Sequence, residues 1–128
     1  MAVSLSEFEK ALKALEEVLV MAEQNLNDPI MFKVIRDATI QRFEFCVELA
    51  WKVSSKILGL ASSSAAKMVI RDMAQNSLIQ DTQIWFDFVE ARNKSSHSYD
   101  ENIAREVYLA AQNFVPEGQK LLKTLKRK

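Results

Sequence analysis

Glycine and proline are scarce in this chain, with two of each among 128 residues. Since these residues build tight turns, their scarcity leaves little material for β-hairpins or long loops. Leu, Ala, Glu, Lys and Gln dominate instead, and they favour helices. We predict an all-α fold in a single domain, residues 1–128, that buries about 65–70% of its unfolded surface.

Cysteine and histidine occur once each, as Cys46 and His97. One cysteine excludes an internal disulfide, and this pair does not suffice for a dedicated zinc site in one chain. We therefore predict no metal and no cofactor. The sequence also lacks a signal-peptide pattern, and no apolar run approaches the roughly 20 residues that span a bilayer. These absences predict a soluble, cytoplasmic protein.

Net charge is also absent, because 17 basic residues balance 17 acidic ones. No whole-molecule field therefore draws in nucleic acid. The charges are uneven, since residues 1–30 carry two lysines against six acids and residues 118–128 carry five basic residues and no acid. We interpret the basic end as a solvated helix end that complements the helix dipole; a phosphate-contacting tail is the alternative.

Helix-start signals divide the chain. Ser4 with Glu7 forms a capping box ahead of a seam of apolar residues that runs to position 26. Asp28 and Pro29 open a second helix that extends to residue 58, before a glycine. The serines of "LASSSAA" offer an N-cap to a short third helix at about residues 65–76.

Two further aspartates complete the pattern. Asp81 caps a fourth helix, and Asp100 caps a fifth, which Pro116 must bend or restart. With no internal repeat or linker, the sequence predicts an antiparallel bundle of four main helices plus a short one.

The second helix carries only a thin polar stripe, and most of its other positions are apolar. Such a helix needs cover on two sides, which in a small chain predicts a homodimer. Arg42 breaks the apolar surface, amid Phe45, Leu49 and Val53. It either meets an acid or carbonyl or reaches the surface, or it contacts a phosphate in a cleft. The stripe consists of Asp37, Gln41, Glu44, Glu48, Lys52 and Ser55.

The break "ARNKSSHSYD", residues 91–100, gathers polar residues between the last two helices. Arg92 and His97 are spaced so that both side chains can face one spot. A guanidinium binds phosphate oxygens and an imidazole moves a proton near neutral pH, so the pair suits metal-free RNA cleavage by the 2′-hydroxyl. The bland alternative is a solvated turn in which Asn93 caps the helix and Tyr99 packs on Ala104.

Three blocks carry a family resemblance. "RNKSSH" resembles the arginine–histidine signature of the HEPN superfamily, and the added tyrosine resembles one branch of it. With "RDATIQRFEFCVELAWK", "IWFDFVEARNKSSHSYDE" and "AREVY", nearly the whole chain is similar to the nucleotidyltransferase substrate-binding protein family. The resemblance implies a four-helix bundle that dimerises and pairs with a separate minimal nucleotidyltransferase, usually encoded beside it.

The resemblance also implies roles by position. Some members of the wider group are metal-independent RNase toxins, silenced when the nucleotidyltransferase transfers AMP to the tyrosine. Arg92 and His97 would be catalytic and Tyr99 the modification target. Asn93 would support the catalytic pair, and we ourselves predict that Asn93, Lys94 and Arg42 contact the substrate.

Two functions follow, and whether the chain is itself an enzyme stays open between them. The first is a binding subunit that presents a substrate, or itself, to the nucleotidyltransferase. The second is an RNase toxin neutralised by adenylylation of Tyr99. Zero net charge favours the first, because generic RNA binding is driven by neutralising phosphates. A nucleotide or RNA is the expected ligand class.

Overall fold

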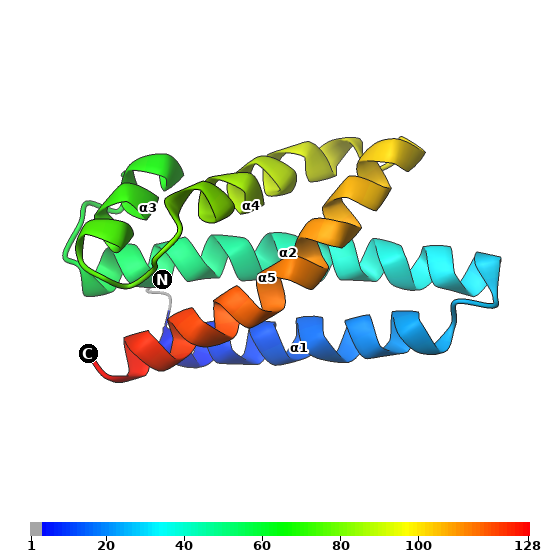
Figure 1. The fold of residues 1–128 in the computed structure, drawn as a ribbon, viewed down its shortest axis with the longest axis horizontal. Coiled ribbons are helices and arrows are strands. Elements are labelled where there is room, and N and C mark those ends of the chain that lie inside the picture. Colours follow the sequence, from blue (N-terminus) through cyan, green and yellow to red (C-terminus); the bar gives the residue numbers. More distant parts are fainter. Residues whose placement is uncertain (1–3) are drawn as a thin grey trace.

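The structure is a computed structural model that describes residues 4–128 (Figure 1). Over that range the chain is helical without a β-strand, which confirms the all-α prediction. No helix within it is both long and apolar enough to cross a membrane. The elements are α1 (Leu5–Gln24), α2 (Pro29–Ile57), α3 (Ala66–Gln75), α4 (Thr82–Lys94), the 3₁₀ turn η1 (Ser95–His97) and α5 (Glu101–Lys126).

The four long helices begin at the predicted caps. Ser4 accepts a hydrogen bond from a backbone N–H of α1, Asp28 from one of α2, Asp81 from one of α4, and Asp100 from two of α5. Each bond satisfies an amide that has no partner inside the helix. Local chemistry therefore sets where these helices start.

The predicted serine cap of α3 is wrong. Ala65 occupies the N-cap position, and no side chain accepts a hydrogen bond there. The preceding serines belong to a turn, in which the Ser64 amide donates to the Ala61 carbonyl at 3.0 Å. The turn thus ends at Ser64, one residue before the N-cap Ala65, and the serines do not cap the first amides of the helix.

The helices pack around a hairpin of α1 and α2, which lie side by side and antiparallel (Figure 1). The short α3 packs near the end of α2, and α4 lies along the other side of α2 from α1. The last helix, α5, crosses obliquely and contacts α1, α2 and α4. This crossing sets the turn η1 at the end of the bundle where α4 meets α5.

The last helix runs through Pro116 without a break, so the proline does not restart it. Two residues further on, Gly118 is buried where α5 crosses α1. A Cβ built there would lie 3.1 Å from atoms of both Leu12 and Phe114. A side chain at this position would therefore require the Leu12 and Phe114 side chains to shift by a few tenths of an ångström.

Phe114 is the centre of the aromatic core. Its ring meets those of Phe43, Trp85 and Phe88 edge-to-face, with centroids 5.8, 5.5 and 5.1 Å apart. Each such pair contributes about 0.5–1.5 kcal/mol beyond the burial of area. Since these side chains come from α2, α4 and α5, the cluster joins three helices at one point.

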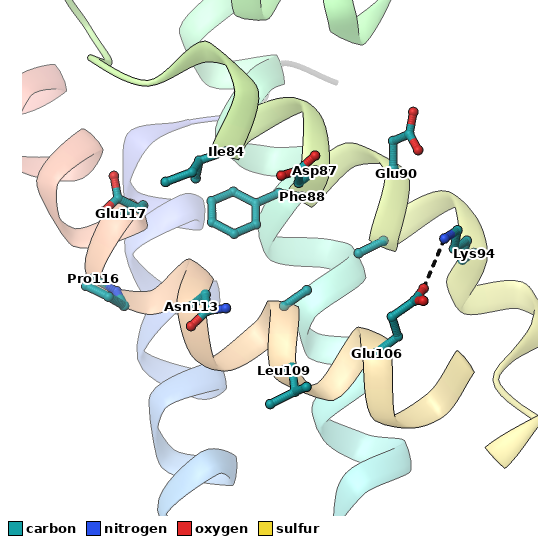
Figure 2. A pocket seen from close by; sticks show the side chains of 12 residues that line it. Ile84, Asp87, Phe88, Glu90, Lys94, Glu106, Leu109, Asn113, Pro116 and Glu117 are labelled. Atoms are coloured by element: carbon teal, nitrogen blue, oxygen red, sulfur yellow. Dashed lines mark hydrogen bonds and ion pairs between the residues drawn. The ribbon is translucent and has the colours of Figure 1, made fainter. Parts of the chain in front are cut away.

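A groove of about 620 Å³ remains between α4 and α5 (Figure 2). Its floor is apolar, with Phe88 at the centre, and its rim is acidic. Lys94 is the only basic residue among its lining residues, and its ammonium group is paired with Glu106 at 3.0 Å. Leu109, on α5, lines this groove. It also lines a second groove, which lies between the N-terminal halves of α2 and α5.

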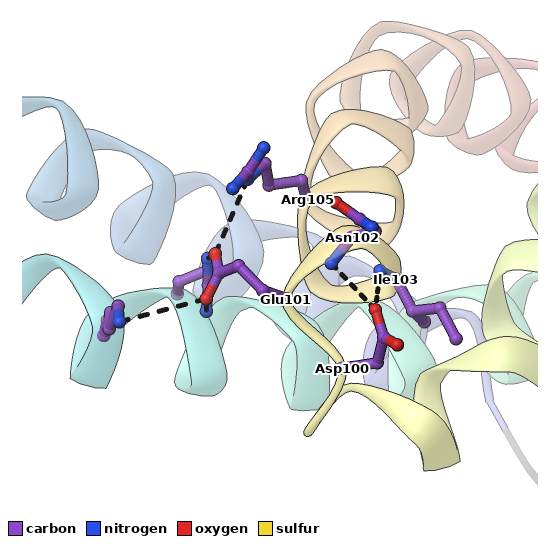
Figure 3. Close-up of polar contacts among 7 residues, drawn as sticks. Asp100, Glu101, Asn102, Ile103 and Arg105 are labelled. Carbon is purple, nitrogen blue, oxygen red and sulfur yellow. Dashed lines mark hydrogen bonds and ion pairs between the residues drawn. The ribbon is translucent and has the colours of Figure 1, made fainter.

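An ion pair fastens the start of α5 to α2. Arg36 is buried on α2, and its guanidinium donates two hydrogen bonds to the Glu101 carboxylate, Nη1 to Oε2 and Nη2 to Oε1. Lys33 Nζ lies 3.9 Å and Arg105 Nε 3.6 Å from the same carboxylate. Figure 3 shows this cluster beside the Asp100 cap. Three cations therefore share one acid at the helix start.

The surrounding cations make this contact sensitive to acid. The hydrogen bonds from Arg36 lower the pKa of Glu101 to about 2, and the charges of Arg36, Lys33 and Arg105 act in the same direction against desolvation. Because the folded pKa lies below the unfolded value of about 4.3, the stabilisation is complete above that value and is lost as the pH falls towards 2.

We predict that Glu101→Gln lowers the urea midpoint of unfolding at pH 7, and that the difference from the unmutated chain narrows steadily between pH 5 and pH 3. The control is Glu90→Gln, since Glu90 pairs with Lys67 on an exposed surface and such pairs contribute little. A midpoint difference for Glu101→Gln that is the same at pH 7 and pH 3 would contradict the prediction.

Candidate functional site

The polar break forms a tight corner between α4 and α5. Ser95 is buried, and its hydroxyl donates to the Arg92 carbonyl at 2.5 Å. The amide of Ser98 donates to the Ser95 carbonyl, and that of Asp100 to the His97 carbonyl. With these bonds the chain passes from η1 directly into the cap of α5, so the motif side chains stand on a fixed backbone.

Arg92 lies in the last turn of α4, as predicted, and faces α2. Its Nη2 donates to Glu48 Oε2 at 3.1 Å, while its Nε is buried without a partner. The side chain is about one-third exposed (36%). The guanidinium therefore keeps donor capacity on a partly exposed side chain, although an acid already compensates its charge.

Glu48 belongs to the predicted polar stripe and also accepts from Lys52 at 2.8 Å. Hydrogen bonds from Lys52, and then from Arg92, lower the pKa of Glu48 against its desolvation. The carboxylate is thus ionised at neutral pH and remains a competitor for any anion that approaches Arg92.

His97 and Tyr99 face each other on the outside of the corner. The imidazole Nδ1 lies 3.3 Å from the Tyr99 hydroxyl oxygen, and the rings meet edge-to-face with centroids 5.9 Å apart. Tyr99 is 86% exposed, so it does not pack on Ala104, as it would in the alternative of a solvated turn. A phenol in this position is open to an incoming reagent and stands beside a group that can take its proton.

Arg92 and His97 turn to different partners in the single chain. The guanidinium contacts Glu48 on α2, and the imidazole contacts Tyr99. Across residues 4–128 no hydrogen bond joins the two side chains. Their convergence on one anionic ligand therefore stays a prediction.

Asn93 and Lys94 lie at the same corner, and Lys94 has an acidic partner of its own. Asn93 is exposed, and its carbonyl accepts a long hydrogen bond from Ser96 at 3.5 Å. Lys94 is paired with Glu106 and forms part of the rim of the α4–α5 groove (Figure 2). A substrate that contacted both Lys94 and Arg92 would have to extend from this groove over the end of α4.

Arg42 lies apart from the motif. Its Nη1 donates to the Ala14 carbonyl of α1 at 2.7 Å, which is the carbonyl partner that the sequence left open. Six residues separate Arg42 from Glu48, so the two side chains leave α2 about 120° apart. The contact joins α1 to α2, and it gives Arg42 a structural role in the single chain.

Sequence reasoning missed Arg36 and the acid that pairs with it. Arg36, Ile40, Phe43 and Val47 follow one helical face and are all buried. Extending the apolar stripe of α2 one turn back from Ile40 would have flagged Arg36 as a buried cation that requires an acid. Glu101, 65 residues away, carries no such signal.

Comparison with known proteins agrees with this architecture. A curated relative from Haemophilus influenzae, "Probable ribonuclease HepT", is 27% identical over 98% of this chain and 93% of its own. A solved H. influenzae structure, described as having the fold of a substrate binding domain of a nucleotidyltransferase, is 28% identical with a TM-score of 0.86, over 96% of this chain and 99% of the other. A solved Thermus thermophilus structure is 32% identical with a TM-score of 0.79, over 94% of this chain and 99% of the other.

A family profile also matches nearly the whole chain. The profile of the family described as "Nucleotidyltransferase substrate binding protein like" matches residues 3–127. The match therefore includes the capped helices and the corner between α4 and α5. The resemblance found in the three sequence blocks is thereby confirmed. The chain belongs to the nucleotidyltransferase substrate binding protein-like family.

Proposed function

We propose that this chain is the substrate-binding subunit of a two-component system, and that it works with a separate minimal nucleotidyltransferase. The proposal is supported chiefly by the family match over residues 3–127, together with the bundle it shares with a structure described as the fold of a nucleotidyltransferase substrate binding domain. The catalytic centre for nucleotidyl transfer is assigned to the partner chain. This subunit contributes the surface on which the acceptor is held.

The exposed corner supplies one acceptor directly. The Tyr99 oxygen can attack the α-phosphorus of ATP held by the partner, forming an oxygen–phosphorus bond as the bond to pyrophosphate breaks. The phenol proton passes to His97, whose Nδ1 is within 3.3 Å of the hydroxyl. The products are AMP-modified tyrosine, pyrophosphate and protonated His97, which then releases the proton to solvent, so atoms and charge balance without a further reagent.

We predict that incubation with ATP and the nucleotidyltransferase encoded beside this chain adds the mass of one AMP group to the chain. Tyr99→Phe should abolish the addition. The matched control is Tyr108→Phe, since Tyr108 is the only other tyrosine and is buried. Intact-mass spectrometry measures both variants. Equal labelling of Tyr99→Phe and the unmutated chain would remove Tyr99 from the site.

A homodimer forms part of the proposal. On α2, Val34, Ala38, Gln41 and Phe45 share one face, of which Val34 is 60% and Phe45 55% exposed. The same face continues to Glu48, the partner of Arg92. Pairing this face with a second copy would cover the apolar side chains and bring two motif corners near each other.

We predict that Phe45→Glu converts a dimer to a monomer in sedimentation velocity at micromolar concentration, because a carboxylate cannot be buried unpaired in an apolar interface. Met68→Glu is the matched control, with Met68 49% exposed on α3, away from the α2 face. A dimer that persists in Phe45→Glu would rule out this face as the interface.

The second candidate function is a metal-independent RNase, favoured by the pairing of His97 with a proton-bearing neighbour and by the unpartnered Nε of Arg92. RNA would have to displace Glu48 from Arg92 before a phosphate could bind. In that role His97 would move the proton of the 2′-hydroxyl, and Arg92 would stabilise the developing phosphoryl charge.

For this function we predict cleavage of RNA in the presence of a chelator, reduced by about 10²–10⁴-fold in His97→Ala. Ser96→Ala, at an exposed neighbouring position, is the matched control and should retain the rate. Measurement is by gel assay of a labelled RNA. Cleavage that survives unchanged in His97→Ala comes from a contaminant and would reject the RNase function.

A further inference from the structure

A second groove, of about 480 Å³, lies between the N-terminal halves of α2 and α5. Its floor is aromatic, because the Phe32 and Tyr108 rings meet edge-to-face with centroids 5.5 Å apart. Leu26 and Leu109 form apolar walls, and each is more than half exposed. The volume falls in the range of about 300–1,000 Å³ typical of small-molecule sites.

The rim of this groove is cationic. Lys33, Arg36 and Arg105 line it, and Glu101 is the only acid among the lining residues. Arg36 donates from both Nη atoms to Glu101, whereas Lys33 and Arg105 approach the carboxylate only at 3.9 and 3.6 Å. Their side chains are about two-thirds exposed. Two cations thus face the opening with most of their donor capacity free.

Two polar atoms at the groove are buried without a partner, the Tyr108 hydroxyl and Arg36 Nε. Both side chains are more than nine-tenths buried and both line the groove. An unsatisfied buried donor is unfavourable, so a ligand acceptor that reached it would gain affinity by satisfying it. Burial raises the pKa of Tyr108, and the Glu23 charge adds to the effect, so the hydroxyl is a proton donor at neutral pH.

We infer that this groove binds a small aromatic phosphate, a class that includes nucleoside monophosphates. The planar ring lies against Phe32 and Tyr108, and the phosphate lies between Lys33 and Arg105. A phosphate monoester carries about −1.5 to −2 charges at pH 7, which matches the two exposed cations of the rim. The Tyr108 hydroxyl donates to an acceptor on the ligand.

The site stands apart from the motif corner. Its groove is lined from α2, α5 and the turn before α2, whereas Arg92 contacts Glu48 twelve residues further along α2 than Arg36. Binding here needs neither Tyr99 modification nor RNA cleavage. The inference therefore holds or fails independently of the proposed function.

The test is isothermal titration calorimetry of the full chain at low ionic strength, where exposed charges are least screened. The probes are phenyl phosphate and AMP, which combine a ring with a phosphate, and inorganic phosphate, which lacks the ring. We expect at least one ring-bearing probe to bind with a dissociation constant below about 1 mM and inorganic phosphate to bind about tenfold more weakly.

Variants then locate the binding. The double variant Lys33→Gln/Arg105→Gln should weaken binding about tenfold, since it removes both exposed cations from the rim while the buried Arg36–Glu101 pair stays. The matched control is Lys67→Gln/Arg71→Gln, which removes two cations that flank the Phe86 ring where α3 meets α4. It changes the net charge equally and should leave affinity unchanged.

Tyr108→Phe tests whether the Tyr108 hydroxyl binds the ligand or is only buried. It keeps the ring and removes only the unpartnered group, so affinity should fall about threefold to tenfold while thermal stability is maintained or rises. The inference is overturned if neither ring-bearing probe binds, if inorganic phosphate binds as tightly as they do, or if both double variants weaken binding equally.

Discussion

The buried guanidinium of Arg36 is the constraint on which the rest of this bundle depends. A charge in that position must be compensated, and the acid that compensates it is the first residue of α5. Satisfying Arg36 therefore fixes where α5 begins over α2. The place of α5 in turn determines the corner that carries Tyr99 and the cationic rim that carries Arg105.

The two arginine–carboxylate pairs differ in what they allow. Arg36 donates two hydrogen bonds to Glu101 from a buried position, an arrangement that an exposed anion cannot easily displace. Arg92 donates one hydrogen bond to Glu48 from a side chain about one-third exposed, and its Nε is unpartnered. The first pair is suited to holding the fold, and the second to exchanging its carboxylate for a ligand.

Sequence alone predicted what is determined locally. The caps at Ser4, Asp28, Asp81 and Asp100 depend on residues within three positions, and all four were predicted correctly. The serine cap of α3 failed because the turn before that helix uses Ser64, a choice that composition does not reveal.

In the candidate site, too, local contacts were predicted from the sequence and long-range contacts were not. The spacing of Arg92, His97 and Tyr99 predicted their place at one corner, and Tyr99 does lie against His97. The partners of the two predicted arginines come from distant segments. Glu48 is 44 residues from Arg92, and Ala14 is 28 residues from Arg42. Contacts of that range depend on how helices cross, which periodicity does not specify, so Arg42 was grouped with a motif that it does not contact.

Leu109 is a lining residue of both grooves that flank α5. It stands on the ridge of α5, more than half exposed, as a wall shared by the acidic groove on one side and the cationic groove on the other. Because one side chain lines both cavities, a change of its rotamer would alter the shape of each of them.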